Sequence, residues 1–357
     1  LIQSTASNDA PRLDYSTGTK AFLLEPQSTN LVTYSEDFSN VDWFKSGVSV
    51  VGGFTSPDGT ANAFKLVESN ISEPHRIQSP VVTNSSYTFS VFAKKSNRFL
   101  QIIGNLSQND YVNFDLENGV VGGSGSGVTN IKIEEYANEF YRCSGTITMT
   151  SLSIGLSSLI NANYRDSYQG DGTSGLYIFG AQLEQNSYAT SYIPTSGASA
   201  TRNQELCNNA TPVINSEEGT LYAEIATLAN DGTFRSVSLS DGTALNYISL
   251  SYFNTTNSFK GVLILNNITQ VAISFTLSDA TDFNKIAIKY KQNDFSLFVN
   301  GTKVGVDVSG NTFPINTLNK LSFSRGDGAV KFFGNTKGLK VYPKALADVQ
   351  LEDLTTI

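Results

Sequence analysis

Period-two alternation of apolar and polar residues is the feature that most constrains the fold of this chain. In the segment 87–94, YTFSVFAK, the odd-numbered residues fall on one face of an extended strand and the even-numbered residues fall on the other. Similar short runs recur along the chain and are separated by turns rich in glycine, such as GVVGGSGSG at 119–127. The pattern predicts an all-β protein built from antiparallel β-sandwich (jelly-roll) domains.

Two sets of strand-like runs follow a short lead-in, so we expect two domains in tandem. Residues 1–29 are polar with little periodicity and are assigned to the lead-in segment, although AFLLEP at 21–26 is apolar enough to dock on the domain that follows. The first sandwich is predicted over 30–197 and the second over 217–357. Residues 198–216 are polar with weak periodicity and are expected to form the linker.

The second domain carries the clearest local signals. Ile286, Ile288 and Tyr290 alternate with lysines, as in a strand with one buried face. Asn300-Gly301 then marks a two-residue type I′ hairpin turn, because both central residues of that turn need a positive φ. Near the end of the chain, GLKVYPKALADVQLEDL predicts a strand, a stop at proline and a short amphipathic helix.

Charge and hydropathy narrow the class of partner. The formal net charge is −8 and no cluster of Lys or Arg offsets it, so we expect no nucleic-acid partner. A neutral glycan or a cationic surface would meet no such repulsion. No run approaches the roughly 18 apolar residues of a membrane span, so no membrane insertion is expected. The first residue is Leu1 and no signal-peptide core follows it, so we expect a fragment or a processed piece.

Several separated motifs extend this reading of the first domain. They are the stretch 11–47, SPDGTANAFKLVES at 56–69, YTFSVFAKK at 87–95, EFYRCSGTIT at 139–148 and YQGDGTSGLYIFGAQLEQNSYATSYIPTSG at 168–197. In content and order they resemble a module that is common in phage tail-fibre and head-spike proteins. The resemblance covers residues 11–197 and implies a jelly roll similar to carbohydrate-binding modules.

The second domain resembles a different family. FNKIAIKYKQNDFSLFVNGTKVG at 283–305 and FFGNTKGLKVYPKALADVQLEDL at 332–354 carry the likeness, which is to laminin-G or concanavalin-like lectin domains. It covers about residues 217–354. This resemblance implies a fold and little about function, since the fold serves binders, enzymes and passive spacers.

The even-numbered face of the segment 87–94 offers a candidate glycan site. If Tyr87 and Phe89 face the core, Phe92 and Lys94 share an outer surface. An exposed phenyl ring beside a lysine suits a sugar that carries an acidic group. The expected carbohydrate-binding residues on this sheet and its loops are Phe92, Lys94, Tyr111, Arg142, Tyr168 and Asp171. The alternatives are that both faces of the sheet are packed or that Phe92 faces another subunit, and Trp43 is expected in the core.

A structural calcium ion is the one cofactor expected, and it is implied by the resemblance. Related jelly rolls often bind calcium where the first and last strands meet, through carboxylates and carbonyl oxygens. Asp37 and Glu184 are the side-chain candidates for this metal site. Calcium needs about six to eight oxygens, of which only these two are named. The alternative is that Asp37 and its neighbour Glu36 are solvated turn residues.

Catalytic patterns are not found. Glu36 and Asp37 are adjacent, so on a strand they point to opposite faces and do not converge on one atom. His75 lies in SEPHRIQSP, without the strand-to-helix turn of a serine nucleophile. Paired carboxylates at the spacing of concanavalin-like hydrolases are missing from the second domain, and no Cys/His cluster suits zinc. We therefore expect no enzymatic activity.

These signals predict a non-enzymatic carbohydrate-binding or adhesion protein. It would belong to a phage fibre or spike, lie on the virion surface or outside the cell, and recognise bacterial surface glycans. Other virion proteins and further copies of the chain in a homo-oligomer are the expected protein partners. Two alternatives stay open: a capsid-decoration or fibre spacer protein that makes only protein contacts, and a polysaccharide-degrading enzyme.

Overall fold

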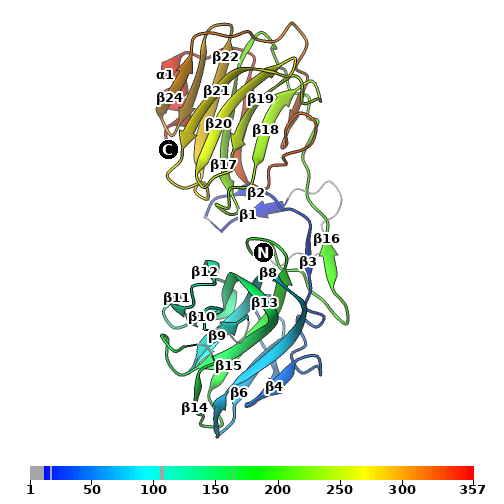
Figure 1. Ribbon diagram of the computed structural model, residues 1–357, viewed down its shortest axis with the longest axis vertical. Helices are drawn as coiled ribbons and strands as arrows, with labels where there is room; N and C mark the ends of the chain where they lie inside the picture. The colour runs from blue at the N-terminus through cyan, green and yellow to red at the C-terminus, as the bar shows by residue number, and fades with distance from the viewer. Residues whose placement is uncertain (1–11, 17, 105–107, 164) are drawn as a thin grey trace. The chain divides into compact units, whose positions relative to one another are not determined.

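The computed structural model describes residues 12–16, 18–104, 108–163 and 165–357, which form two all-β units (Figure 1). The first unit contains Gln27–Asn203, and the second combines Gln204–Ile357 with residues 12–26. Every strand pairing in both units is antiparallel within the described residues, apart from one isolated bridge. The predicted all-β fold with two antiparallel β-sandwiches is confirmed.

The first unit is made of short strands around two long ones, with one turn of 3-10 helix, η1 (Ala137–Glu139). Its strands are β3 (Ser28–Asn30), β4 (Phe44–Ser46), β5 (Val48–Phe54), β6 (Ala63–Glu68), β7 (Ser72–Pro74), β8 (Arg76–Ser96), β9 (Phe99–Ile103), β10 (Tyr111–Asp115), β11 (Val120–Ser124), β12 (Thr129–Glu135), β13 (Tyr141–Ser157), β14 (Ser167–Gln169), β15 (Gly175–Glu184) and β16 (Ala200–Arg202). The main sheet has the order β11-β10-β9-β13-β8-β15-β6-β5, with β12 on β13 and β4 on β8. The pairs β7–β14 and β3–β16 complete the unit.

The sheet of the first unit wraps around one core. Strands near both ends of the sheet order contribute to the same apolar cluster, for example Phe114 of β10 and Leu66 of β6. Phe89 and Val91 of β8 also belong to it, as the alternation predicts. Trp43 is 1 % exposed in this cluster, where its indole N–H donates to the carbonyl oxygen of Tyr34 at 2.9 Å. Trp43 is therefore a core residue, as expected.

The opposite face of β8 is packed as well. A second cluster of aromatic residues covers it, and its fully buried members are Ala63, Phe92, Phe140, Phe179 and Tyr192. The segment after β15 brings Tyr192 back over the sheet, where its hydroxyl is hydrogen-bonded to Ser35 at 2.7 Å. Both faces of the central strands are thus buried, which leaves less open sheet surface than the sequence indicates.

The second unit is a sandwich of a seven-stranded and a five-stranded sheet (Figure 1). Its elements are β1 (Arg12–Asp14), β2 (Ala21–Leu24), β17 (Glu218–Thr227), β18 (Arg235–Ser240), β19 (Tyr247–Tyr252), β20 (Ser258–Leu265), β21 (Ile268–Thr276), β22 (Asn284–Lys291), β23 (Phe295–Val299), β24 (Thr302–Asp307), β25 (Lys320–Ser322), β26 (Gly334–Tyr342) and α1 (Asp348–Thr355). The sheet orders are β1-β2-β26-β17-β22-β23-β24 and β21-β20-β19-β18-β25. Within the described residues, no helix has the length and apolar character that a bilayer crossing needs.

Alternating residues of both sheets form the core of the second unit. Ile286, Ile288 and Tyr290 of β22 are 0 % exposed, as the period-two pattern predicts. The turn between β23 and β24 has φ of 47° at Asn300 and 79° at Gly301, which confirms the predicted hairpin. The predicted C-terminal helix is α1, which places Leu351 on the outer face of the seven-stranded sheet.

The expected lead-in segment contributes to the second unit. Its residues 1–11 lie outside the described residues, but β1 and β2 pair with each other and β2 pairs with β26. The expectation that the apolar run at 21–26 docks on the domain that directly follows it is wrong, because β2 pairs with β26 and Leu24 lies in the core of the second unit. Part of the expected linker is ordered too, because β16 pairs with β3 and Ala210 bridges Leu321.

Candidate functional site

The sheet face expected to bind sugar is not exposed. Phe92 is 0 % exposed, and its ring centroid lies 5.0 Å from that of Tyr136 and 5.9 Å from that of Tyr192. Arg142 is 4 % exposed, and its Nη2 donates to Ser90 Oγ and to the carbonyl oxygen of Thr190. The expectation that Phe92 offers a stacking surface is wrong, because the returning segment after β15 covers this face.

Lys94 and Tyr111 do not join a common site. Lys94 Nζ lies 2.7 Å from Glu139 Oε2, in a partly exposed ion pair. Tyr111 is 8 % exposed on β10, and β9 and β13 separate that strand from β8 in the sheet. The sequence placed them together because both carry suitable side chains, whereas the sheet order keeps their strands apart.

Tyr168 and Asp171 are brought together around a buried carboxylate. Glu68 accepts hydrogen bonds from Tyr168 Oη at 2.6 Å, from Asp171 N at 2.8 Å and from Arg98 at 2.6 Å. Burial alone would raise the pKa of Glu68, but the bonds from Arg98 and Tyr168 outweigh it and lower the pKa. Burial and the negative charge of Glu68 raise the pKa of Tyr168. Every oxygen of Glu68 is engaged, so this cluster ties the loop before β15 to the sheet.

The two carboxylates expected to hold calcium have separate partners. Asp37 accepts hydrogen bonds from the backbone and side chain of Ser39, as a turn residue does. Glu184 is 0 % exposed and accepts five hydrogen bonds. Its donors are Ser28 Oγ, Gln182 Nε2, Asn186 Nδ2, and the amide and hydroxyl of Thr190. Within the described residues, no group of three or more His, Cys, Asp or Glu side chains is placed to hold a metal ion.

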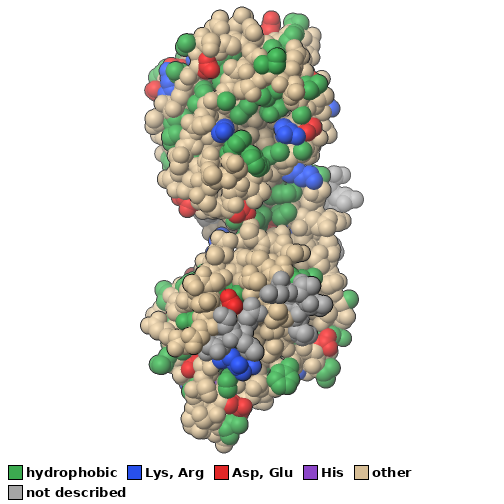
Figure 2. All heavy atoms as spheres, viewed as in Figure 1, with side chains coloured by type: hydrophobic (Ala, Val, Ile, Leu, Met, Phe, Trp, Pro, Cys, Tyr) green, Lys and Arg blue, Asp and Glu red, His purple; other side chains and the backbone are tan. Residues whose placement is uncertain are grey.

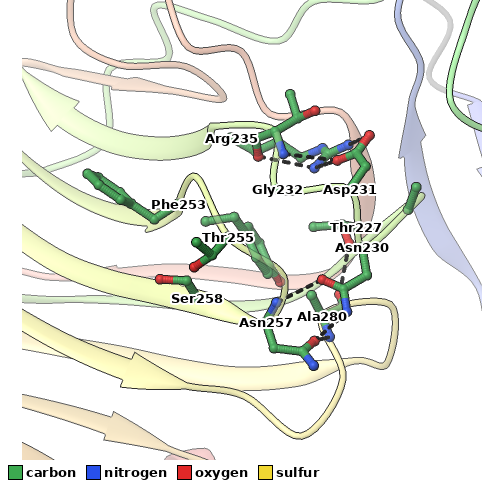
Figure 3. Close-up of a pocket in the computed structure, with 13 residues that line it drawn as sticks. Thr227, Asn230, Asp231, Gly232, Arg235, Phe253, Thr255, Asn257, Ser258 and Ala280 are labelled. Carbon is green, nitrogen blue, oxygen red and sulfur yellow. Dashed lines mark hydrogen bonds and ion pairs between the residues drawn. The ribbon is translucent and has the colours of Figure 1, made fainter.

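A shallow, open depression lies among the loops of the second unit (Figure 3). Three loops that are far apart in the sequence surround it, at 228–234, 253–257 and 277–283. They follow β17, β19 and β21, so three strand ends of the sandwich position them. A concave place with several polar groups at the end of a sandwich is a candidate binding site.

Two asparagines fix the floor of the depression. Asn230 Nδ2 donates to Asn257 Oδ1 at 2.7 Å, and Asn257 N donates to Asn230 Oδ1 at 2.8 Å. The same Asn257 Oδ1 accepts from Ala280 N at 2.9 Å, so one amide links all three loops (Figure 3). Asn257 has φ of 58°, a conformation that asparagine adopts more readily than most residues. The loops are thereby held in place before any ligand arrives.

An ion pair forms one wall. Arg235 Nη1 lies 2.9 Å from Asp231 Oδ1 and Arg235 Nη2 lies 3.2 Å from Asp231 Oδ2, which is a two-point contact (Figure 3). The Arg235 side chain is 4 % exposed and that of Asp231 is 13 % exposed. Gly232 between them has φ of 69°, and a Cβ there would approach the carbonyl oxygen of Asn254 to 3.2 Å. Glycine is therefore required for this turn to fit beside the neighbouring loop.

Aromatic rings and hydroxyl groups complete the site. Phe234 and Phe253 are in edge-to-face contact with centroids 4.6 Å apart, and Phe234 is 43 % exposed. Across from the ion pair lie Thr255 and Ser258, whose hydroxyl groups form no hydrogen bond within the described residues (Figure 3). Figure 2 shows this unit from the side of its five-stranded sheet, where charged side chains are isolated among uncharged and hydrophobic surface.

The chemistry of this site is that of recognition. Hydroxyl, amide and ion-pair groups can exchange hydrogen bonds with a polyhydroxylated ligand, and a phenyl ring can cover an apolar C–H face. Asp231 is the one carboxylate among the 13 described residues that line the depression, and it is already paired with Arg235. Glycoside hydrolysis by a pair of carboxyl groups therefore has no basis here.

Sequence reasoning missed this site. The signal in the sequence is weak: NDGT at 230–233 and NTTN at 254–257 are turn-like runs rich in Asn, Asp and Thr. Such runs occur at many strand ends of this chain. Only the fold shows that these two lie beside each other.

Comparisons with known proteins give structural likenesses alone. No family model and no curated protein matches the chain. The CBM40 of a Ruminococcus gnavus IT-sialidase is 17 % identical, with 42 % of this chain and 98 % of that chain covered at a TM-score of 0.34. A SAP-like pentraxin from Limulus polyphemus is 12 % identical, with coverages of 42 % and 74 % and a TM-score of 0.33. Domains LG4-5 of the mouse laminin α1 chain are 12 % identical, with coverages of 76 % and 86 % and a TM-score of 0.28. TM-scores this low carry no conclusion about ligand or activity.

Proposed function

We propose that the chain is a non-enzymatic carbohydrate-binding protein and that the depression of the second unit holds one sugar residue. The observation that carries this proposal is the set of unbonded hydroxyl groups, the fixed amide pair and the ion pair around a hollow with aromatic rings at its edge. Sugars present both hydroxyl groups and apolar C–H faces, so they suit such a mixture.

The charges at the site favour a neutral sugar. The positive charge of Arg235 is balanced by Asp231 within the wall itself. Arg235 Nε has no hydrogen-bond partner among the described residues and can donate to a ligand hydroxyl group. A hydrogen bond between protein and sugar replaces hydrogen bonds to water, so each one adds only about 1 kcal/mol to the binding free energy. A single site therefore binds weakly.

The biological setting follows from the resemblance of the first domain. We infer that the protein belongs to a phage fibre or head spike on the virion surface, where it contacts bacterial surface glycans and other virion proteins. Repetition of weak sites on a homo-oligomer would raise the overall strength of attachment. The ordered motifs between residues 11 and 197 support this setting.

The test is binding of the full chain to a glycan array, followed by titration calorimetry with the best neutral ligand. The double variant Thr255→Val and Ser258→Ala removes two hydroxyl groups from the depression without removing any hydrogen bond between described residues. We expect its affinity to fall about thirtyfold, since two lost hydrogen bonds cost about 1 kcal/mol each. Phe234→Ala should weaken binding further.

The matched control is Thr269→Val with Ser274→Ala, which changes the same two residue types at exposed positions of β21. It should bind as the wild type does. Equal affinities for the site variant and the control would refute the placement of the site. Release of reducing ends from any bound glycan would refute the non-enzymatic assignment.

A further inference from the structure

One row of residues on the sheet of the first unit has not been assigned a role. Ser46 on β4 pairs with Arg76 on β8, Arg76 pairs with Gly155 on β13, and Gly155 pairs with Gln101 on β9. Paired residues share a face of the sheet. Their neighbours Ile77, Ile154 and Ile102 belong to the core, so this row faces away from it.

Arg76 is a buried cation without a counter-ion. It is 9 % exposed, and its Nε has no hydrogen-bond partner among the described residues. It also forms no ion pair with any carboxylate in the described part of the chain. A buried charge is costly unless it is paired, so a group left in this condition points to a ligand that supplies the missing acceptor.

A second arginine, Arg165, lies between two residues that are hydrogen-bonded to the same row. Gln101 Oε1 accepts from Asp166 N at 3.2 Å, and Gln101 Nε2 donates to the carbonyl oxygen of Asn163 at 2.9 Å. These bonds fix the loop that carries Arg165 over the same row of the sheet. A Cβ at Gly155 would meet Arg76 Cβ at 3.5 Å and the carbonyl oxygen of Gln101 at 3.6 Å, so the two residues lie close on either side of the glycine. Burial first, and then the positive charge of Arg165, lower the pKa of Arg76.

The acidic neighbour of Arg165 is engaged elsewhere. The Asp166 carboxylate accepts from Ser157 Oγ at 3.0 Å, from Ser158 N at 2.6 Å and from Ser158 Oγ at 2.9 Å. Within the described residues it forms no ion pair with Arg76 or Arg165. Arg76 and Arg165 are therefore close enough to repel each other, and neither forms an ion pair with a carboxylate among the described residues.

An aromatic ring stands at the edge of the same face. Phe44 pairs with Gln78, two positions along β4 and β8 from the Ser46–Arg76 pair, which is about 7 Å. Phe44 is 64 % exposed, so its ring is open to solvent. An exposed ring on the same face as the Arg76 row suits a sugar ring with an acidic substituent.

We propose that this face of the first unit binds a saccharide that carries an acidic group, with Arg76 and Arg165 holding the anionic oxygens and Phe44 covering the sugar ring. The acidic group can be a carboxylate, a sulfate ester or a phosphate ester, which share the anionic oxygens that a guanidinium recognises. The site does not depend on the depression of the second unit, because its residues all belong to the first unit.

The test is titration of the full chain with oligogalacturonate and with its uncharged methyl ester. We expect the acid to bind at least tenfold more tightly than the ester, with a loss of affinity as salt is added. Arg165→Gln should reduce the affinity for the acid at least tenfold, and Phe44→Ala should reduce the affinity for both forms. Arg76→Gln changes a buried residue and could prevent folding. Arg165 is partly exposed, so Arg165→Gln tests the proposal without disturbing the core.

Further titrations identify the acidic group and distinguish this proposal from the proposed site in the second unit. Sulfated and phosphorylated oligosaccharides are titrated in parallel with the oligogalacturonate. The compound with the highest affinity of the three identifies the preferred acidic group. Arg325→Gln removes an arginine that is ion-paired to Asp327 in the second unit and should leave acid binding unchanged. The Thr255→Val, Ser258→Ala variant should leave it unchanged too. Equal affinity for acid and ester, no binding of any acidic form, or the same loss in Arg325→Gln as in Arg165→Gln would overturn the proposal.

Discussion

Arg12 and Glu205 are 193 residues apart in the sequence, yet Arg12 Nη2 donates to Glu205 Oε2 at 2.6 Å within the second unit. Glu205 Oε2 also accepts from the backbone N–H of Glu25 at 2.8 Å. These contacts fix β1 and β2 next to the start of Gln204–Ile357, so the chain of the first unit is inserted between two parts of the second. The second unit is completed only when its two separate segments meet.

We predict that the N-terminal strands are part of the core of the second unit. Leu24 is 2 % exposed, and Leu24→Ala should lower the free energy of unfolding by about 3 kcal/mol through the cavity it leaves. The control is Leu206→Ala, at a position that is 51 % exposed. This variant should change the free energy of unfolding by less than about 0.5 kcal/mol. Chemical denaturation checks both, and equal stabilities of the two variants would contradict the role of β2.

We predict that Phe92 stabilises the first unit and does not bind sugar. Phe92→Ala should lower the free energy of unfolding by about 4 kcal/mol, because it removes a fully buried ring from an aromatic cluster. Phe44→Ala makes the same change at a position that is 64 % exposed and should leave stability nearly unaltered. Thermal denaturation of the two variants distinguishes them. A folded Phe92→Ala protein of wild-type stability would show that the ring is not packed as described.

The fold was predictable because its signals are local. Period-two alternation in 87–94 and 284–291 placed strands and their buried faces, and Asn300-Gly301 placed a hairpin. The pairing of β2 with β26 was not predictable, because nothing near Leu24 in the sequence indicates a partner more than 300 residues away.

The candidate sites were less predictable, because they too depend on contacts between residues far apart in the sequence. The alternation correctly assigned Phe92 to the face opposite Phe89, but the burial of that face depends on Tyr192, which returns from a distant loop. The depression in the second unit needs three loops to converge, and Asn257 reveals its role only through contacts with Asn230 and Ala280. Arg76 is a candidate ligand-binding residue only because it forms no ion pair with a carboxylate among the described residues, which the sequence does not reveal.

We predict that Glu68 makes stability depend on pH in acid. Its folded pKa lies below the usual value of 4.5, because hydrogen bonds from Arg98, Tyr168 and the Asp171 amide outweigh its burial. A lowered pKa means that Glu68 stabilises the fold above about pH 4.5, and that this contribution is lost as the pH falls through the folded pKa. Glu68→Gln should lower the free energy of unfolding by about 3 kcal/mol near neutral pH and by progressively less below pH 4.5.

The control for Glu68 is Glu117→Gln, since Glu117 is 64 % exposed in a surface ion pair with Lys95. Unfolding by denaturant across a pH series gives the difference between wild type and each variant. The difference should shrink on acidification for Glu68→Gln and stay near zero for Glu117→Gln. A Glu68→Gln difference that is constant with pH would mean that the carboxylate charge is not what stabilises the loop before β15.

We predict that Gly301 is required both for the β23–β24 turn and for the seat of α1. Its φ of 79° costs a residue with a Cβ about 1–2 kcal/mol. The added Cβ would also lie 3.1 Å from Thr356 Oγ1, while the Gly301 amide donates to the buried Thr355 hydroxyl at 3.1 Å. Gly301→Ala should therefore lower the free energy of unfolding by at least about 1 kcal/mol and increase hydrogen exchange in α1.

Gly338→Ala provides the matched comparison for the turn. Gly338 lies in β26 outside the positive-φ region, and a Cβ there would meet its nearest neighbour at 3.4 Å, an ordinary contact. The same glycine-to-alanine change should be neutral or slightly stabilising, because alanine reduces the freedom of the unfolded chain. If Gly301→Ala proved as stable as Gly338→Ala, with unchanged exchange in α1, the left-handed turn would not be what holds the end of α1 against the sheet.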